Sequence, residues 1–295
     1  MKLKSIKNPV LKTMLALTAC TSLTTFAGTP AVKSKTVVKP EAAPLFTGTV
    51  DVGWDSRYYF RGLWFADNTA WSGVNLSIPL TSNLTLGLGA LYTSSVDTRV
   101  NNLGLDDSLD YSELDLIASL TYDAKFAKFQ VVYTSYQFFD GFSGTTFGPA
   151  GSARFGAGEF NVQHVNELGF VASSTVAGLN FYGAYYYDFN IGGAYFEVGA
   201  DYPIKVNDRL SIIPGVKGGY GLDYYSNGTG PQNGGFGGVS SGFTHLLATV
   251  SAPIAITKTA TLTPYVAYNF SGRARVANNL TNDEMFGGVK LSVSF

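Results

Sequence analysis

The last twelve residues of the chain alternate between apolar and polar side chains. Every second residue from Phe295 back to Met285 is apolar except Gly287, and polar residues such as Lys290 lie between them. A period of two is typical of a β-strand with one apolar face and one polar face. The length of this segment suits a strand that crosses a bilayer at a tilt. The pattern therefore predicts a closing strand with one face toward lipid.

The same alternation recurs eleven times upstream of the closing strand. The twelve predicted segments are 50–54, 74–80, 84–92, 114–122, 129–133, 168–172, 179–187, 194–202, 210–216, 246–250, 262–270 and 285–295. Short connections are expected at 81–83, 123–125, 176–178, 205–208 and 254–259. Longer ones are expected at 61–69, 95–107, 138–163, 222–241 and 271–283, with 190–193 as a short exception. Short turns alternating with long loops predict an all-β fold, a single closed antiparallel transmembrane barrel of about 12 strands.

The C-terminal segment resembles the closing strand of bacterial outer-membrane β-barrels. In those proteins the last residues serve as the assembly signal, which implies that role for Phe295 and the barrel-assembly machinery as a partner. The alternative for this strand alone is a core strand that ends a soluble β-protein, and the recurrence of the pattern favours the barrel. An even strand number then places the start of the first strand and the end of the last strand together at the periplasmic rim.

Composition fits a barrel in lipid. Charged residues make up only 14% of the chain, while Gly, Tyr and Phe number 34, 18 and 21. The chain has no run of 18 apolar residues, so the sequence predicts no transmembrane helix. The single Cys excludes an internal disulfide framework, and no basic surplus points to nucleic acid. Outer-membrane lipid is the expected surrounding.

The N-terminus predicts export. Four Lys precede a short apolar stretch, which is typical of a signal peptide over residues 1–27 cut after Ala27. The alternative is lipidation at Cys20, because residues 17–20 resemble a lipobox. Residues 28–45 contain three Pro and are expected to form a flexible periplasmic segment. Residues 1–45 carry seven Lys and one Glu, so the barrel region 46–295 has a formal net charge of −7, against −1 for the whole chain.

Aromatic residues cluster where strands meet the long loops. We expect them to form the outer interfacial girdle: Tyr58, Tyr59, Phe60, Trp71, Tyr92, Tyr111, Tyr136, Tyr187, Phe243 and Phe270. Within this set, the stretch 56–62 matches S-x-Y-x-F-R-G and resembles the start of the Gcw_chp-type family of bacterial porin-like barrels. There, too, the stretch ends the first strand. The resemblance covers about the first forty residues of the body and implies an outer-membrane barrel, a porin in function, without catalytic residues.

The polar face of the strands predicts a charged lumen. Its expected lining residues are Asp51, Asp55, Arg57, Glu113, Asp115, Lys128, Glu167, Glu197, Asp201, Lys217 and Lys290. Seven acids against four bases favour cations or neutral polar solutes over anions. The alternative is that these charges pair across the lumen and plug it. Because Arg57 and Arg61 lie close to Asp55 in the sequence, we expect a local clamp between these arginines and the Asp55 carboxylate at the outer mouth.

Other chemistry has weaker support in the sequence. The acidic run Asp106, Asp107 and Asp110 before Glu113 lacks the spacing of an EF-hand loop, so we expect a solvated loop and no metal site. The Gly-rich segments 138–163 and 222–241 lack a phosphate-loop motif; they are surface loops, or the longer one folds inward as a constriction. His245, with Ser240 and Ser241 nearby, is the only histidine placed for a lipid hydrolase, and no nucleophile motif accompanies it.

The hypothesis from the sequence is an outer-membrane channel for passive diffusion of small polar or cationic solutes, with no cofactor and no enzymatic activity. The first alternative is an adhesin or structural barrel with a plugged lumen, which binds a surface partner through its loops. The second is an outer-membrane lipid hydrolase. The solute, the oligomeric state and the partner are left open by the sequence.

Overall fold

The structure is a computed structural model that describes residues 45–96, 112–139, 164–190, 192–224, 241–272 and 283–295, apart from the side chains of residues 63–65. Its strands are β1 (Thr47–Phe60), β2 (Leu63–Pro79), β3 (Leu84–Ser95), β4 (Ser112–Asp123), β5 (Lys128–Phe138), β6 (His164–Val176), β7 (Leu179–Asp188), β8 (Gly193–Asp201), β9 (Ile204–Lys205), β10 (Ser211–Leu222), β11 (Gly242–Ser251), β12 (Ile254–Ala255), β13 (Ala260–Ser271) and β14 (Glu284–Ser294). No helix in these ranges is long and apolar enough to cross a membrane.

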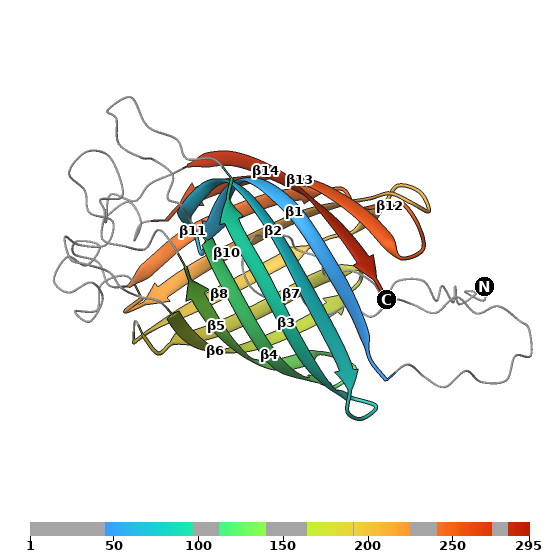
Figure 1. The fold of residues 1–295 in the computed structure, drawn as a ribbon, viewed down its shortest axis with the longest axis horizontal. Helices are drawn as coiled ribbons and strands as arrows, with labels where there is room; N and C mark the ends of the chain where they lie inside the picture. Colours follow the sequence, from blue (N-terminus) through green and yellow to red (C-terminus); the bar gives the residue numbers. More distant parts are fainter. Residues whose placement is uncertain (1–44, 97–111, 140–163, 191, 225–240, 273–282) are drawn as a thin grey trace, which may run out of the picture.

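Twelve of these strands form a closed antiparallel barrel, as predicted, and β9 and β12 are two-residue strands within turns (Figure 1). The closure is a ladder between the first and last strands, which runs from Thr49 opposite Ser294 to Asp55 opposite Gly288. Beyond the ladder, Gly48 and Phe295 exchange two backbone hydrogen bonds of 3.0 Å. Among the described strands, closure leaves no open sheet edge with a row of unpaired backbone groups, which a barrel in lipid requires.

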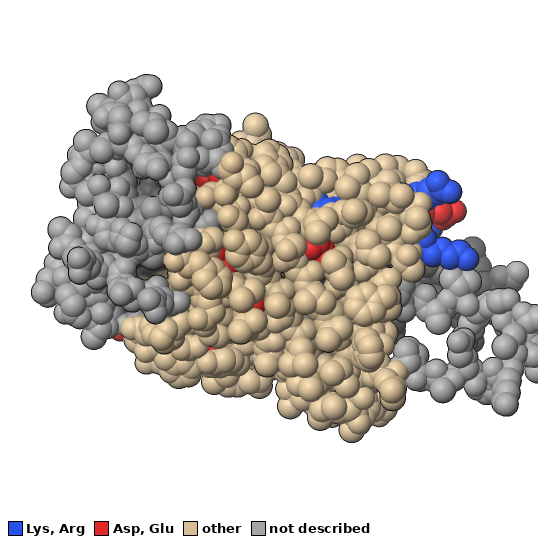
Figure 2. Space-filling view, in the orientation of Figure 1, with Lys and Arg blue, Asp and Glu red and all other residues tan. Residues whose placement is uncertain are grey.

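The two faces of the barrel wall differ sharply in chemistry. Along β1, Val50, Val52 and Trp54 point outward with over two-fifths of their surface exposed, while Asp51 and Asp55 between them are buried. The described wall in Figure 2 is accordingly almost free of charged atoms, apart from small patches. Apolar residues face outward because the surrounding solvent is hydrocarbon, and the polar residues face the lumen, where they can hydrogen-bond.

The start of β1 and the end of β14 lie at one end of the barrel, which we call the near rim (Figure 1). Its turns are short, as predicted. Ala177 and Gly178, both with positive φ (52° and 87°), form a two-residue turn between β6 and β7. We call the opposite end the far rim. Most of the long connections expected there lie outside the described residues.

One predicted loop is absent. The connection 61–69 was expected to be long, but β1 ends at Phe60 and β2 begins at Leu63, so Arg61 and Gly62 alone form the turn. Both have positive φ, 51° and 78°, as a type I′ hairpin turn requires. Residues 63–69, which were expected to lie in the loop, instead continue the ladder: Asp67 pairs with Arg57.

The predicted aromatic girdle is only partly correct. Tyr92, Tyr187, Phe243 and Phe270 do point outward near the far rim and are each about two-fifths exposed. Tyr58, Tyr59 and Tyr136 are instead buried inside the barrel, and Trp71 turns inward to hydrogen-bond Asp55. Phe60 packs edge-on against Tyr136. Tyr111 lies outside the described residues. These inward rings lie on the lumen side of the wall instead of at the lipid interface.

Candidate functional site: the barrel lumen

The eleven predicted lining residues all lie on the lumen face of their strands. Asp51, Asp55, Glu113, Asp115, Glu167, Glu197, Asp201 and Lys217 are buried. Arg57 and Lys290 are half-buried, and Lys128 is exposed at the near rim. That these side chains line a conducting path stays a prediction.

Near the near rim, carboxylates are held by neutral donors. Asp51 accepts hydrogen bonds from Thr49 (3.1 Å), from Asn75 (3.3 Å) and from the Ser292 hydroxyl. On the other side of the barrel, the Asn180 amide donates to Asp201 over 2.8 Å. These acids therefore present hydrogen-bonded carboxyl groups to the lumen.

In the middle of the barrel, each carboxylate has a tyrosine partner. Asp55 accepts from the Trp71 indole N–H (2.7 Å) and from the Tyr265 hydroxyl (2.5 Å). Glu197 accepts from two further tyrosines: Tyr182 at 2.6 Å and Tyr195 at 3.1 Å. Glu197 also pairs with Lys217 at 3.1 Å. Lys217 is thus one lumen base that is neutralised by the wall.

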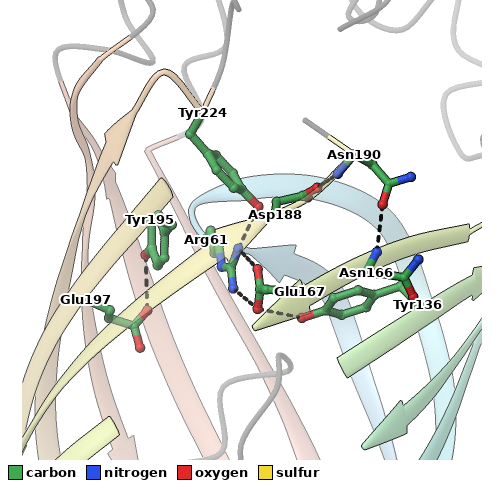
Figure 3. Close-up of polar contacts among 9 residues, drawn as sticks. All are labelled: Arg61, Tyr136, Asn166, Glu167, Asp188, Asn190, Tyr195, Glu197 and Tyr224. Atoms are coloured by element: carbon green, nitrogen blue, oxygen red, sulfur yellow. Dashed lines mark hydrogen bonds and ion pairs between the residues drawn. The ribbon is translucent and has the colours of Figure 1, made fainter. Parts of the chain in front are cut away.

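At the far rim, the tip of the β1–β2 hairpin crosses the lumen. The Arg61 guanidinium contacts Glu167 of β6, Tyr186 of β7 and Tyr195 of β8. These strands lie opposite β1 in the sheet order. The hairpin tip is therefore inside the barrel mouth, and Figure 3 shows the side chain of Arg61 ending between Glu167 and Tyr224.

The contacts of Arg61 are those of a buried ion pair. Its two terminal nitrogens reach the two Glu167 oxygens at 2.6 and 2.7 Å, and one of them also donates to the Tyr224 hydroxyl at 2.7 Å. Both Arg61 and Glu167 are at most 3% exposed. The fork of two parallel bonds is the strongest form of arginine–carboxylate contact.

Aromatic rings enclose the same guanidinium. The Arg61 Cζ atom lies 4.6 Å from the ring centroids of Phe60, Tyr186 and Tyr195, and 5.3 Å from that of Tyr224. Cations over ring faces at such distances are attracted by the ring quadrupole, more strongly where water is excluded. We call Glu167, Tyr186, Tyr195 and Tyr224 the cation cage.

Residues on both sides of Arg61 attach the hairpin to the rest of the barrel. The Tyr58 hydroxyl donates to Glu113 of β4 at 3.1 Å. In the other direction, Tyr59 donates to Glu284 of β14 at 2.6 Å and stacks on Phe286. A Cβ at Gly62 would lie 2.6 Å from the His245 Cβ, so a larger residue at this position would require the turn or β11 to shift.

The predicted clamp forms with different partners. Arg57 and Arg61 were expected to pair near Asp55. Instead, Arg57 pairs with Asp67 (3.4 Å) and with Glu284, while Arg61 pairs with Glu167. The prediction was wrong because it assumed that residues near in sequence meet. The inward bend of the hairpin carries Arg61 to the opposite wall, and Asp67 comes into reach through the β1–β2 register.

His245, the hydrolase candidate, lies in the lumen wall. It is 1% exposed, and its Nδ1 lies 3.0 Å from the Thr244 hydroxyl. Ser241 hydrogen-bonds Asp223, and Ser240 lies outside the described residues. Whether the protein is an enzyme is untested by this geometry.

The acidic run Asp106, Asp107 and Asp110 lies outside the described residues. Within the described part of the chain, no group of three or more His, Cys, Asp or Glu side chains is arranged to hold a metal ion. The Gly-rich loops 138–163 and 222–241 are described only at their ends, so an inward fold of the longer one stays a prediction.

Three residues of the cation cage, Tyr186, Tyr195 and Tyr224, were not predicted from the sequence, whereas Glu167 was predicted as a lumen residue. One local signal existed: Arg61-Gly62 directly follows a strand and precedes an apolar run, which permits a two-residue hairpin turn. No sequence signal pairs Arg61 with Glu167, because 105 residues of chain separate them.

Comparisons with solved structures bear on the fold. The chain superimposes on the COG4313 outer-membrane channel from Pseudomonas putida F1 with a TM-score of 0.51 at 15% identity, covering 88% of this chain and all of that one. Weaker likenesses include the KdgM porin (TM-score 0.46, 10% identity, 84% and 99% covered) and the outer-membrane phospholipase A from Escherichia coli (0.42, 13%, 84% and 92%).

At these identities the likeness shows the fold alone. The chain folds as an outer-membrane-type β-barrel. No family model matches it, and no curated protein does. The resemblance to the Gcw_chp-type family is therefore still a prediction.

Proposed function

We propose that the protein is an outer-membrane channel through which small polar solutes diffuse, with cations favoured over anions. The observation that carries the proposal is the chemistry of the lumen face, where carboxylates recur from the near rim (Asp51, Asp201) through the middle (Asp55, Glu197) to the far rim (Glu113, Asp115). A barrel that needed only to be stable could fill its interior with apolar side chains, since buried polar groups cost free energy unless they are hydrogen-bonded.

The charge balance supports the preference for cations. Three of the lumen bases, Arg57, Arg61 and Lys217, are neutralised by carboxylates. Asp51, Asp55 and Asp201 accept hydrogen bonds from neutral donors, and seven of the eleven predicted lining residues are acidic. A lumen of one sign in a low-dielectric wall concentrates ions of the opposite sign. The mechanism is passive diffusion without a cofactor, and the docked β1–β2 hairpin narrows the far rim.

Conductance in planar bilayers tests the proposal. Full-length protein inserted under a salt gradient should give discrete current steps and a reversal potential that reports cation preference. The Arg61→Ala variant should conduct more, because its hairpin loses the anchor on the opposite wall. Absence of current from both proteins would refute the channel.

The docked hairpin favours a second candidate, a structural or adhesin barrel with a plugged lumen. Arg61, Tyr58 and Tyr59 fix the hairpin to strands on several sides of the lumen. In this candidate the surface loops bind a partner and nothing passes through. A sealed bilayer together with specific attachment of cells that display the protein would support it.

A further inference from the structure

The Arg61 guanidinium occupies a complete recognition site for an organic cation. Glu167 supplies a fork of two acceptors at 2.6 and 2.7 Å, Tyr224 supplies a third acceptor, and the rings of Tyr186 and Tyr195 face the cation from 4.6 Å. Glu167 and the three tyrosines all lie in or next to β6, β7, β8 and β10. The site is therefore built by one wall, and its occupant comes from the opposite wall.

The wall positions the cage through its own contacts. Glu167 sits in the ladder opposite Asp188 and accepts from Tyr136 at 3.4 Å. The Tyr195 hydroxyl donates to Glu197, and its ring packs 6.4 Å from Tyr186 and 5.7 Å from Tyr224. These contacts come from the wall itself, so they can hold Glu167 and Tyr195 in place when Arg61 leaves.

The hairpin tip, by contrast, depends on the cage. Arg61 has a φ of 51°, a left-handed conformation that non-glycine residues adopt at a steric cost. Asn, Asp or Gly would satisfy such a turn more easily. The contacts of the Arg61 side chain with the opposite wall offset this cost, so filling the cage and docking the hairpin are one event.

We propose that the cation cage is a binding site for solutes that carry a guanidinium group, and that Arg61 occupies it as a tethered stand-in. A guanidinium solute competes with Arg61 for Glu167 and releases the β1–β2 hairpin from the far rim. A planar guanidinium matches both the fork and the ring faces, whereas an ammonium group gives only a point charge. The release step rests on the proposed channel function, while binding to the cage does not.

The test is chemical complementation of Arg61→Ala in full-length protein folded in detergent micelles. Removing the side chain vacates the cage, so methylguanidinium should raise the thermal unfolding temperature of this variant and bind at least about tenfold more tightly than to the wild type. Tetramethylammonium and sodium, at equal ionic strength, should give less than half of that shift.

Arg57→Ala is the matched control, because it removes an arginine from the same hairpin but leaves the cage filled. It should respond like the wild type. Adding Glu167→Gln to Arg61→Ala should abolish the response. Equal responses of the Arg61 and Arg57 variants to methylguanidinium would overturn the proposal, as would an undiminished response in the double variant.

If Arg61→Ala does not fold, Arg61→Lys replaces it. Lysine retains the charge but cannot form the fork, so methylguanidinium should still bind more tightly than to the wild type; equal binding would overturn the proposal. Conductance is measured in parallel. Binding without current in any variant would refute the channel and leave the cage intact, whereas current that methylguanidinium leaves unchanged would refute the release step.

Discussion

Arg61 and Glu167 join opposite walls of the barrel through a buried, two-bond ion pair with N–O distances of 2.6 and 2.7 Å. The pair determines where the β1–β2 hairpin lies, because the tip of the hairpin has only two turn residues and one of them is Arg61. Together with the contacts of Tyr58 and Tyr59, this ion pair therefore shapes the lumen at its far rim.

Glu167→Gln should destabilise the protein strongly. The substitution leaves the buried Arg61 guanidinium without its counter-charge. Removing one partner of a buried ion pair lowers the free energy of unfolding by about 3–5 kcal/mol. The variant can avoid part of this cost by releasing the hairpin, so the loss in unfolding free energy should be accompanied by a rise in conductance. Denaturant unfolding followed by a heat-modifiability gel measures the first effect.

Asp208→Asn is the control for that change. Asp208 pairs with Lys205, and both side chains are more than half exposed, so the loss should be small. Similar losses for both carboxylates would show that the docked hairpin contributes no more than a surface pair.

A disulfide should lock the hairpin in place. A Cβ at Gly62 would lie 2.6 Å from that of His245, so the Gly62→Cys, His245→Cys double variant needs a shift of about 1 Å to reach disulfide geometry. In a Cys20→Ser background, conductance should be low when oxidised and rise on reduction. The conductance of the single-cysteine variants should not change on reduction. If the conductance of the double variant is also unchanged, although mass spectrometry shows that the disulfide has formed, the position of the hairpin does not control conductance.

Asp201→Asn should reduce the preference for cations. Asp201 is buried in the lumen wall near the near rim and is held by the neutral Asn180 amide, so its removal lowers the local negative potential. The reversal potential under a salt gradient should move toward zero. Asp208→Asn is the control, because Asp208 lies in an exposed near-rim turn.

A hydrogen bond from Lys205 lowers the pKa of Asp208 below its usual value, so the carboxylate of the control position is charged at neutral pH. An equal shift of the reversal potential in both variants would point to surface charge instead of the lumen.

Two glycine substitutions should separate lumen packing from the lipid face. An added methyl at Gly288 would overlap Asp55 and the Trp54 carbonyl, while one at Gly183 has its nearest neighbour, Val198, at 4.0 Å. We expect Gly288→Ala to cost about 1–3 kcal/mol through overpacking and Gly183→Ala to be nearly neutral. Equilibrium unfolding measures both, and a larger cost at Gly183 would contradict the closure geometry.

Deleting Phe295 should lower the amount of folded barrel in the outer membrane. The residue is the predicted assembly signal, and its backbone exchanges two 3.0 Å hydrogen bonds with Gly48. Refolding in detergent should be affected much less than assembly in cells, because detergent bypasses the assembly machinery. Equal losses in both settings would assign Phe295 a purely structural role.

Much of the wall could be predicted from the sequence. The alternation of residues such as Val50, Asp51 and Val52 identifies both faces of a strand, because hydrocarbon and lumen select opposite chemistry at every second position. The same rule failed at residues 58–60. A register irregularity between Tyr58 and Tyr59 and the inward bend of the hairpin bury adjacent residues together, which a strict period of two does not allow.

The sequence by itself determined the strand number, the closure of β1 on β14 and the inward position of the charged residues, since each follows from local periodicity in a lipid solvent. Only the tertiary structure decided which charges meet. Arg61 reaches Glu167 because closing the sheet brings β1 opposite β6, β7 and β8, and no local pattern records a distance across a barrel.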